Sequence, residues 1–207
     1  MGRYILPIAV QVLLLGVQGS SYLLIQKSQG EFHDMARPLD KRIPLITQAV
    51  YTYVLWYPLI FLYPLYLFRL SQTAWIMYIL AIVLDVIFSL GIYLLYPSSF
   101  QRPQPPDSVL SGKILRLLYV FNYKGLNCMP SMHCSQCYII LLSAVMCGLN
   151  GVMPAAASAG ISVLCIMIVI STVLTKQHVL IDTYSAVPVA IVSFFIAGGF
   201  VCLYFLG

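Results

Sequence analysis

A run of 51 residues, 125–175, that contains no Asp, Glu, Lys or Arg is the feature that most constrains this chain. About 20 apolar residues cross the hydrocarbon core of a bilayer as a helix, so this run is long enough for two such helices. Residues 148–151, Gly-Leu-Asn-Gly, are followed by Pro154 and are typical of a turn. We therefore predict two consecutive membrane-spanning helices within the run.

Four further apolar stretches predict four more membrane spans: residues 4–26, 43–68, 70–96 and 183–206. The first is too long for the core of a signal peptide, and no small-residue cleavage site follows it. Pro58 and Pro64 predict kinks in the second. The predicted fold is all-α: a polytopic membrane protein with six transmembrane helices in one bundle, forming a single domain over residues 1–207.

The composition excludes the main soluble classes. Apolar residues make up 61% of the chain and charged residues 8%, with a mean hydropathy of +0.92, whereas a soluble domain has about 25% charged residues. A soluble enzyme, a disordered chain and a nucleic-acid-binding protein are therefore excluded. The net charge of +5 is interpreted as contacts to lipid headgroups or phosphate. Cys134 and Cys137 have CxxC spacing after His133, but no second pair follows, so we expect no metal and no cofactor.

Six helices place alternate loops on opposite membrane faces. Residues 27–42, 97–127 and 175–184 share one face, here called face B, and both termini lie on the other, face A. Of the 11 Lys and Arg residues, Arg3 and Arg69 are on face A. The other nine are on face B: Lys27, Arg37, Lys41, Arg42, Arg102, Lys113, Arg116, Lys124 and Lys176.

Three segments of face B, residues 96–103, 127–133 and 171–182, carry polar side chains that membrane proteins retain for function. Arg102 offers a planar fork of donors that matches phosphate oxygens, and Lys176 adds a point charge. Ser131 offers a hydroxyl at the start of a helix, where backbone N–H groups favour an anion. Alternatives remain open: Arg102 as a headgroup anchor, and Lys176 as a side chain reaching the interface.

Two histidines complete a set suited to phosphoryl transfer. His178 and Asp182 are four residues apart, so on a helix they face the same side. Asp182 can then hold one ring nitrogen of His178, which leaves the other free to attack phosphorus. His133 is suited to protonating the departing oxygen.

These segments resemble the motifs of the type 2 phosphatidic acid phosphatase superfamily. Residues 130–133, Pro-Ser-Met-His, resemble its PSGH motif, and residues 102–103 match the end of KxxxxxxRP. Ser171, His178 and Asp182 match the Ser, His and Asp of SRxxxxxHxxxD. The resemblance covers motif order, spacing and the six-helix layout.

The resemblance implies a metal-independent lipid phosphatase or phosphotransferase that forms a phosphohistidine intermediate. It implies that His178 is the nucleophile, Asp182 its orienting residue and His133 the general acid. It also implies phosphate binding by three further residues: Arg102, Ser131 and Ser171. From its position alone, Ser171 can instead bond to its own helix.

The chain departs from the family motifs at three positions. Leu95 stands where the family has Lys, Thr172 where it has Arg, and Met132 where it has Gly. Lys176 and Gln177 before His178 resemble the branch related to inositol phosphorylceramide synthase. Further cations for phosphate are available in the long loop: Lys113, Arg116 and Lys124.

Two enzymatic functions therefore remain open. The first is a lipid phosphatase that hydrolyses a lipid phosphomonoester or pyrophosphate. The second is a lipid phosphotransferase that moves a phosphate-containing headgroup to an alcohol, as in inositol phosphorylceramide or sphingomyelin synthesis. A transporter or channel is a remote alternative, because such folds place broken helices of repeated halves at the midplane, and no repeat is visible. Expected partners are a lipid phosphate and the bilayer, and nothing in the sequence indicates an oligomeric state.

The membrane face of the site has two conflicting indications. The excess of bases places face B in the cytoplasm by the positive-inside rule, whereas the family resemblance implies an extracytoplasmic site. We expect the extracytoplasmic face, because several of these bases are available for phosphate.

Three further features are interpreted by their position in the chain. Tyrosines near span ends, Tyr51, Tyr53, Tyr57, Tyr63, Tyr66 and Tyr96, are predicted to be interfacial anchors. Residues 31–42 are predicted to form a surface loop or short interfacial helix, with a lid over the substrate as the alternative. Asp85, in the third span, is interpreted as an interhelical hydrogen-bonding group or a protonated carboxyl, with a proton or substrate path as the alternative.

Overall fold

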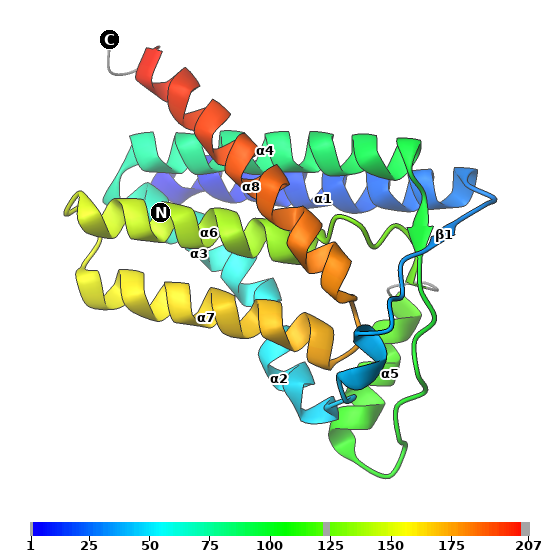
Figure 1. The fold of residues 1–207 in the computed structure, drawn as a ribbon. Coiled ribbons are helices and arrows are strands. Elements are labelled where there is room, and N and C mark those ends of the chain that lie inside the picture. Colours follow the sequence, from blue (N-terminus) through cyan, green and yellow to red (C-terminus); the bar gives the residue numbers. More distant parts are fainter. Residues whose placement is uncertain (1, 122–124, 204–207) are drawn as a thin grey trace.

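The structure is a computed structural model that describes residues 2–121 and 125–203. Six helical segments in it are long and apolar enough to cross a membrane, which confirms the predicted all-α, six-span fold (Figure 1). They are α1 (Ile5–Ser28), the segment Thr47–Leu70, α4 (Gln72–Leu95), α6 (Met132–Leu149), α7 (Ala155–Leu174) and α8 (Leu180–Val201). The predicted turn between α6 and α7 is present, with Gly151 at φ +68°, a backbone conformation that glycine adopts without strain.

The second span is interrupted where its first proline predicts a kink. It consists of a 3-10 turn (Thr47–Ala49), α2 (Val50–Tyr53) and α3 (Trp56–Leu70). The interruption lies at residues 54–55, and α3 continues through Pro64. Pro58 has no N–H to donate to the carbonyl oxygen of Val54, four residues earlier, and its ring crowds that carbonyl, so the helix breaks there. The interruption turns Tyr53 and Trp56 inward at this level of the bundle, where both are buried.

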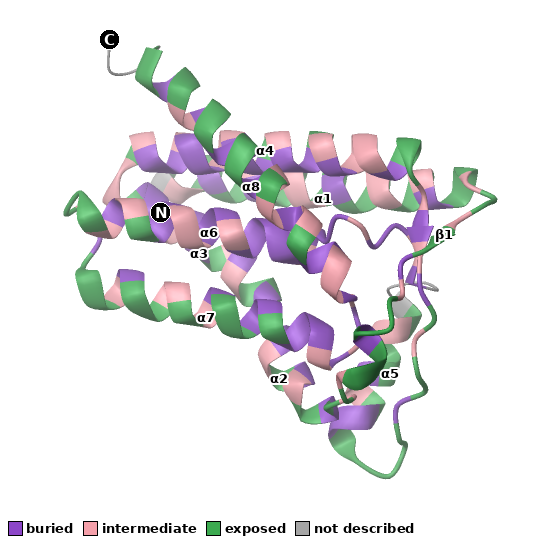
Figure 2. Cartoon of the chain, in the orientation of Figure 1, coloured by how far each residue is buried: buried purple, intermediate pink, exposed green. Residues whose placement is uncertain are grey.

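The centre of the bundle consists of α4, α6 and α8, joined by α7 on the outside of α6 (Figure 1). Small residues are fully buried between these helices: Ala81, Ala144, Ala186 and Ala190. Small side chains let helix backbones approach closely, which matters in a bilayer because lipid tails compete with apolar packing. Figure 2 shows the buried residues gathered on the inward sides of α4 and α6.

The first helix is attached to this centre through polar side chains. Its buried residues are Pro7 and three glutamines: Gln11, Gln18 and Gln26. Gln11 donates to the carbonyl oxygen of Ile60 at 2.9 Å, and Gln18 accepts from Gln136 at 2.9 Å. Just past the helix end, Gln29 donates to the carbonyl oxygen of Tyr93. The remainder of α1 is largely exposed on the lipid-facing side.

Two of the predicted tyrosine anchors are wrong. Tyr53 and Tyr63 are 0% and 2% exposed, because each hydroxyl finds a partner inside the bundle. Tyr63 donates to Ser143 at 2.9 Å, and Tyr53 lies 3.0 Å from His133. Burying a tyrosine is favourable when its hydroxyl is hydrogen-bonded in this way.

The loops of face B contain short elements (Figure 1). The strands β1 (His33–Asp34) and β2 (Ser98–Ser99) pair in parallel, and Asp40–Arg42 forms a 3-10 turn. The loop predicted over 97–127 also contains the helix α5 (Leu110–Phe121). This helix buries Ser111 and Leu115 and exposes Lys113 and Arg116, an amphipathic pattern that fits a helix lying at an interface.

Candidate functional site

The loops of face B meet at one end of the bundle. Asp40 connects the loop 27–42 to the loop 175–184: its carbonyl oxygen accepts from Nζ of Lys176 at 2.8 Å, and its Oδ1 accepts from the backbone N–H of Leu180 at 2.9 Å. The hydroxyl of Tyr119, on α5, donates to the carbonyl oxygen of Thr175 at 2.7 Å. These contacts confirm that the loops 27–42, 97–127 and 175–184 share one face.

His133 is held at the first turn of α6. The side chain of Ser131 caps this helix and accepts from the backbone N–H of Cys134 at 3.3 Å. Nε2 of His133 lies 3.0 Å from the hydroxyl of Tyr53. Its ring centroid is 4.2 Å from that of Trp56, so α2 and α3 together fix the orientation of the imidazole.

His178 is held in the turn between α7 and α8. The carbonyl oxygen of Thr172 accepts from the backbone N–H groups of Gln177 and His178 at 2.9 and 3.1 Å, and Lys176 has a φ of +52°. Nδ1 of His178 lies 3.2 Å from Oδ2 of Asp182, a residue with no exposed surface. The predicted pairing of these side chains is therefore present.

The physical basis of that pairing differs from the prediction. His178 is not on a helix with Asp182, because α8 begins at Leu180. Asp182 lies in the first turn, and its Oδ2 also accepts from the backbone N–H of Val179 at 3.0 Å. A carboxylate at a helix N-terminus is stabilised by the unpaired N–H groups there. One carboxylate thus caps the helix and orients the imidazole.

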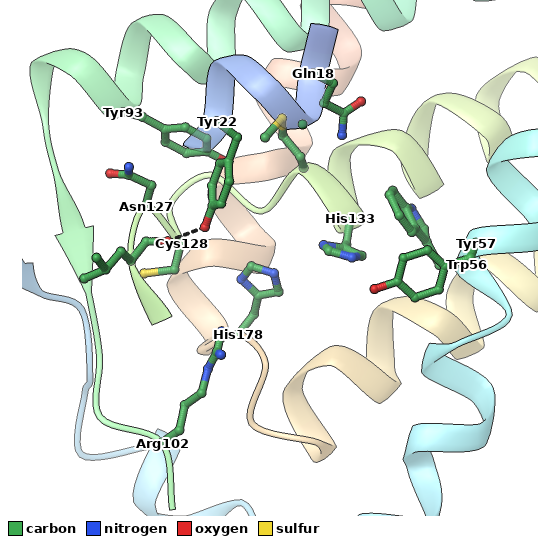
Figure 3. Close-up of a pocket in the computed structure, with 13 residues that line it drawn as sticks. Gln18, Tyr22, Trp56, Tyr57, Tyr93, Arg102, Asn127, Cys128, His133 and His178 are labelled. Carbon is green, nitrogen blue, oxygen red and sulfur yellow. Dashed lines mark hydrogen bonds between the residues drawn. The ribbon is translucent and has the colours of Figure 1, made fainter. Parts of the chain in front are cut away.

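A cavity of about 200 Å³ contains both imidazoles and the Arg102 side chain in its lining. The ring centroids of His133 and His178 are 5.8 Å apart. Figure 3 shows the guanidinium of Arg102 pointing toward His178, with His133 on the side of Trp56 and Tyr57. Two imidazoles and one cation, from segments up to 76 residues apart, are therefore in one small volume.

Arg102 is fixed by contacts on several sides. Its guanidinium carbon lies 5.1 Å from the ring centroid of Tyr119, and Nη2 donates to the carbonyl oxygen of Gln177 at 3.3 Å. Burial lowers the pKa of this guanidinium from its ordinary value, but an arginine remains protonated at neutral pH. Gly125, at φ +61°, packs against it, and a Cβ there would come within 3.3 Å of Nε of Arg102.

The other predicted phosphate ligands do not line this cavity. Ser131 caps α6, and the hydroxyl of Ser171 donates to the carbonyl oxygen of Ile168 in its own helix at 2.6 Å. Lys176 is bonded to Asp40, and burial lowers the pKa of its ammonium group. Phosphate binding by Ser131, Ser171 and Lys176 stays a prediction.

The further cations predicted for phosphate binding, in the loop 97–127, do not line the cavity where the structure describes them. Arg116 pairs with Asp107 at 2.7 Å, and Lys113 is exposed. Lys124 lies outside the described residues. Among residues 2–121 and 125–203, Arg102 is thus the one Lys or Arg side chain that lines the cavity.

The aromatic wall of the cavity could not be identified from the sequence. Tyr22, Trp56, Tyr57 and Tyr93 contribute to it, yet each occurs in an apolar span with no motif around it. Three of them are distinguished by contacts across the fold: Trp56 packs on His133, and the hydroxyls of Tyr22 and Tyr93 each donate at 2.6 Å to a backbone carbonyl oxygen, of Leu126 and Pro130. Such long-range contacts leave no motif in the sequence around each residue.

The cavity reaches the lipid-facing surface. Gly19 of α1 and Tyr57 of α3 both line it, and both are exposed on the outside of the bundle. We call the part of the lining formed by these two residues the α1–α3 portal. The cavity is thus lined in part by exposed residues of two membrane-spanning segments.

Cys134 and Cys137 are fully buried inside the bundle. Within the described part of the chain, no three His, Cys, Asp or Glu side chains are grouped as a metal site would require. Comparisons with protein-family models, with curated proteins and with solved structures found no match. The assignment of a function therefore depends on the chemistry of the cavity.

Proposed function

We propose that this multi-pass membrane protein is a lipid phosphatase that hydrolyses a lipid phosphomonoester or pyrophosphate through a phosphohistidine. The observation that carries the proposal is the pairing of His178 with Asp182 beside His133 and Arg102 in one cavity. An imidazole whose Nδ1–H is held by a carboxylate keeps the lone pair of Nε2 for attack on phosphorus.

The first step forms the bond between phosphorus and Nε2 of His178 and breaks the bond between phosphorus and the lipid oxygen. Protonated His133 gives its proton to that departing oxygen. Asp182 stabilises the positive charge that develops on the His178 ring, and Arg102 binds the phosphate oxygens. In the second step water gives a proton to His133 and forms a bond to phosphorus, while the bond between phosphorus and Nε2 of His178 breaks. This releases inorganic phosphate and restores the protonated His133 and the unmodified His178.

The α1–α3 portal supports a lipid as the substrate. A phosphate held near Arg102 leaves the acyl chains free to pass between Gly19 and Tyr57 into the bilayer. Chain segments that stay in hydrocarbon need no desolvation on binding, so they add no cost to forming the complex.

One observation favours a lipid phosphotransferase as a second candidate. Arg102 alone supplies a cationic side chain to the cavity lining within the described residues. A phosphodiester carries one negative charge, whereas a phosphomonoester carries about 1.5 to 2 at neutral pH. A single guanidinium balances the diester better, and an alcohol in place of water would then resolve the phosphohistidine.

The test incubates purified protein with labelled phosphatidate, phosphatidylglycerophosphate, polyprenyl pyrophosphate and phospholipid donors, with and without inositol, glycerol or ceramide. Release of phosphate at a rate indifferent to every alcohol supports the phosphatase. A phosphodiester product that forms only with one alcohol, while hydrolysis stays negligible, supports the transferase. Neither product, together with no acid-labile labelled protein, would contradict both.

A chelator provides a further check on the proposed chemistry. We expect EDTA to leave turnover nearly unchanged, because Arg102 and the two imidazoles supply the charge and proton transfers themselves. Loss of activity on chelation and its return with zinc would contradict the phosphohistidine mechanism and redirect attention to Cys134 and Cys137 beside His133.

A further inference from the structure

A buried carboxyl in the middle of α4 has no role in the proposed reaction. Asp85 is 0% exposed, and neither of its oxygens makes a hydrogen bond of normal geometry. A carboxylate in the hydrocarbon region of a membrane is costly unless something neutralises it. The residues around Asp85 therefore indicate what the neutralising partner is.

The surroundings of Asp85 consist of neutral oxygen-bearing side chains. Ser89 is four residues further along α4, on the same face, and Ser135 and Gln136 of the adjacent α6 lie within hydrogen-bonding reach of the carboxyl. All three are fully buried. Oγ of Ser89 and Oε1 of Gln136, like both carboxyl oxygens, have no hydrogen-bond partner. Four buried oxygens thus occur together on the facing sides of α4 and α6.

No base is available to pair with this carboxyl. The side chains within hydrogen-bonding reach of it are Ser135 and Gln136, and no described Lys, Arg or His is among the groups that act on it. The ionisable groups that sense its charge are Tyr78 and Tyr93 of the same helix, and α8 presents alanines to the centre of the bundle, Ala186 and Ala190. Neutralisation therefore requires a proton or an ion from outside the chain.

The arrangement of the oxygens favours an ion. A protonated carboxyl is itself a donor and would use a neighbouring hydroxyl or amide oxygen as its acceptor. Oxygens that share a cation turn their lone pairs toward the ion, and Oγ of Ser89, Oε1 of Gln136 and both carboxyl oxygens are without a hydrogen-bond partner of normal geometry here. Hard cations take such oxygen ligands, and a single carboxylate matches a single positive charge. We propose that Asp85, Ser89, Ser135 and Gln136 form a binding site for Na⁺.

The site has a polar connection to the cavity. Nε2 of Gln136 donates to Oε1 of Gln18 at 2.9 Å, and Gln18 lines the cavity that holds the two imidazoles. A hydrated ion that enters from face B therefore meets polar side chains along its way to Asp85. The same glutamine pair joins α1 to α6, so ion binding stabilises the attachment of α1 to the bundle. This inference holds whether or not the protein is a phosphatase.

The test measures thermal unfolding of the purified full-length protein in NaCl and in choline chloride or KCl at equal ionic strength. Ligand that binds only the folded state raises the unfolding temperature in a concentration-dependent way. We expect a saturable rise with Na⁺ alone. Asp85→Asn, a neutral substitution of the same shape, should abolish the rise. Asp107→Asn, which changes an exposed carboxylate paired with Arg116, should retain it.

Two outcomes would overturn the site: a wild-type protein with no Na⁺-specific rise, or an Asp85→Asn variant that keeps the rise. An unfolding temperature that depends on pH but not on Na⁺ would assign a proton to Asp85 instead and equally overturn it. Should Asp85→Asn fail to fold, Ser89→Ala retains the charge and should lower the apparent Na⁺ affinity several-fold. An unchanged affinity in Ser89→Ala would also contradict the site.

Discussion

The two imidazoles of the cavity differ in the residues that hold them. His178 contacts a carboxylate that has no exposed surface, whereas His133 contacts a tyrosine hydroxyl and an indole ring. A carboxylate stabilises the positive charge that forms on an attacking imidazole, and a hydroxyl does so much less. This difference assigns the nucleophile to His178 and the proton donor to His133 within the proposed mechanism.

The first prediction separates these roles. His178→Ala should abolish turnover, because no phosphohistidine can form. His133→Ala should lower kcat by roughly 10²–10⁴-fold, the usual contribution of a general acid, and by less with a good leaving group such as p-nitrophenol. His33→Ala is the matched control, because His33 stacks on Tyr96 outside the cavity. Turnover by His178→Ala at the wild-type rate would remove the nucleophile from the proposal.

The second prediction concerns Tyr53, which the sequence marks as an anchor and the structure buries against His133. Tyr53→Phe removes the hydrogen bond to His133, worth about 0.5–1.5 kcal/mol, so kcat should fall up to about tenfold with little change in KM. Tyr51→Phe, at an exposed tyrosine two residues earlier, should have no effect. Equal kcat values for both variants would show that the Tyr53 hydroxyl does not position the imidazole.

Among helices, the spans are the part that the sequence predicts well. Charged residues are excluded from hydrocarbon, so their absence marks α1, α4, α6, α7 and α8 to within a few residues. The prolines predicted a kink in the second span, but not that the helix is fully interrupted between α2 and α3, and the helix α5 was not predicted. The position of α5 depends on contacts across the fold, such as the 2.8 Å hydrogen bond between Thr47 and Ser111.

The candidate site was predictable to a similar degree. Spacing identified His178 and Asp182, and helix parity brought His133 and Arg102 to the same face. For Ser171 the structure has the alternative that its position indicated, a hydrogen bond to its own helix. The partner of Lys176 was not predictable, because an ammonium group can use many acceptors and only the folded loops bring the carbonyl oxygen of Asp40 to it.

The third prediction concerns the α1–α3 portal. Gly19→Trp should fill it, so turnover of a membrane-embedded substrate should fall at least tenfold while hydrolysis of water-soluble p-nitrophenyl phosphate continues. Gly16→Trp, on an exposed part of the same helix outside the cavity lining, should change neither rate. A bulky residue that lowers both rates equally, or neither, would show that the substrate does not pass between Gly19 and Tyr57.

The whole molecule is asymmetric across the membrane. The site, the strands β1 and β2 and the helix α5 are all at face B, together with most of the bases (Figure 1). Several of those bases have partners within the chain: Arg102 bonds to Gln177, Arg116 to Asp107 and Lys176 to Asp40. Because these Lys and Arg residues have structural partners within the chain, their number on face B is weaker evidence that this face is cytoplasmic.

The fourth prediction is that face B is extracytoplasmic. Ser108→Cys on face B and Asn150→Cys on face A place single thiols at exposed positions, in a background that carries Cys202→Ser because Cys202 is the exposed native cysteine among the described residues. In intact cells an impermeant thiol reagent should label position 108 and not position 150. The opposite pattern would place the site in the cytoplasm.

The glutamines of α1 have a consequence for how the protein is assembled. Apolar contacts distinguish poorly between a neighbouring helix and lipid, so the position of α1 depends on hydrogen bonds from Gln11 and Gln18 and from Gln29 just past its end. We therefore expect a separately synthesised segment 1–30 to associate with residues 31–207 in the same bilayer and to complete the wall of the cavity.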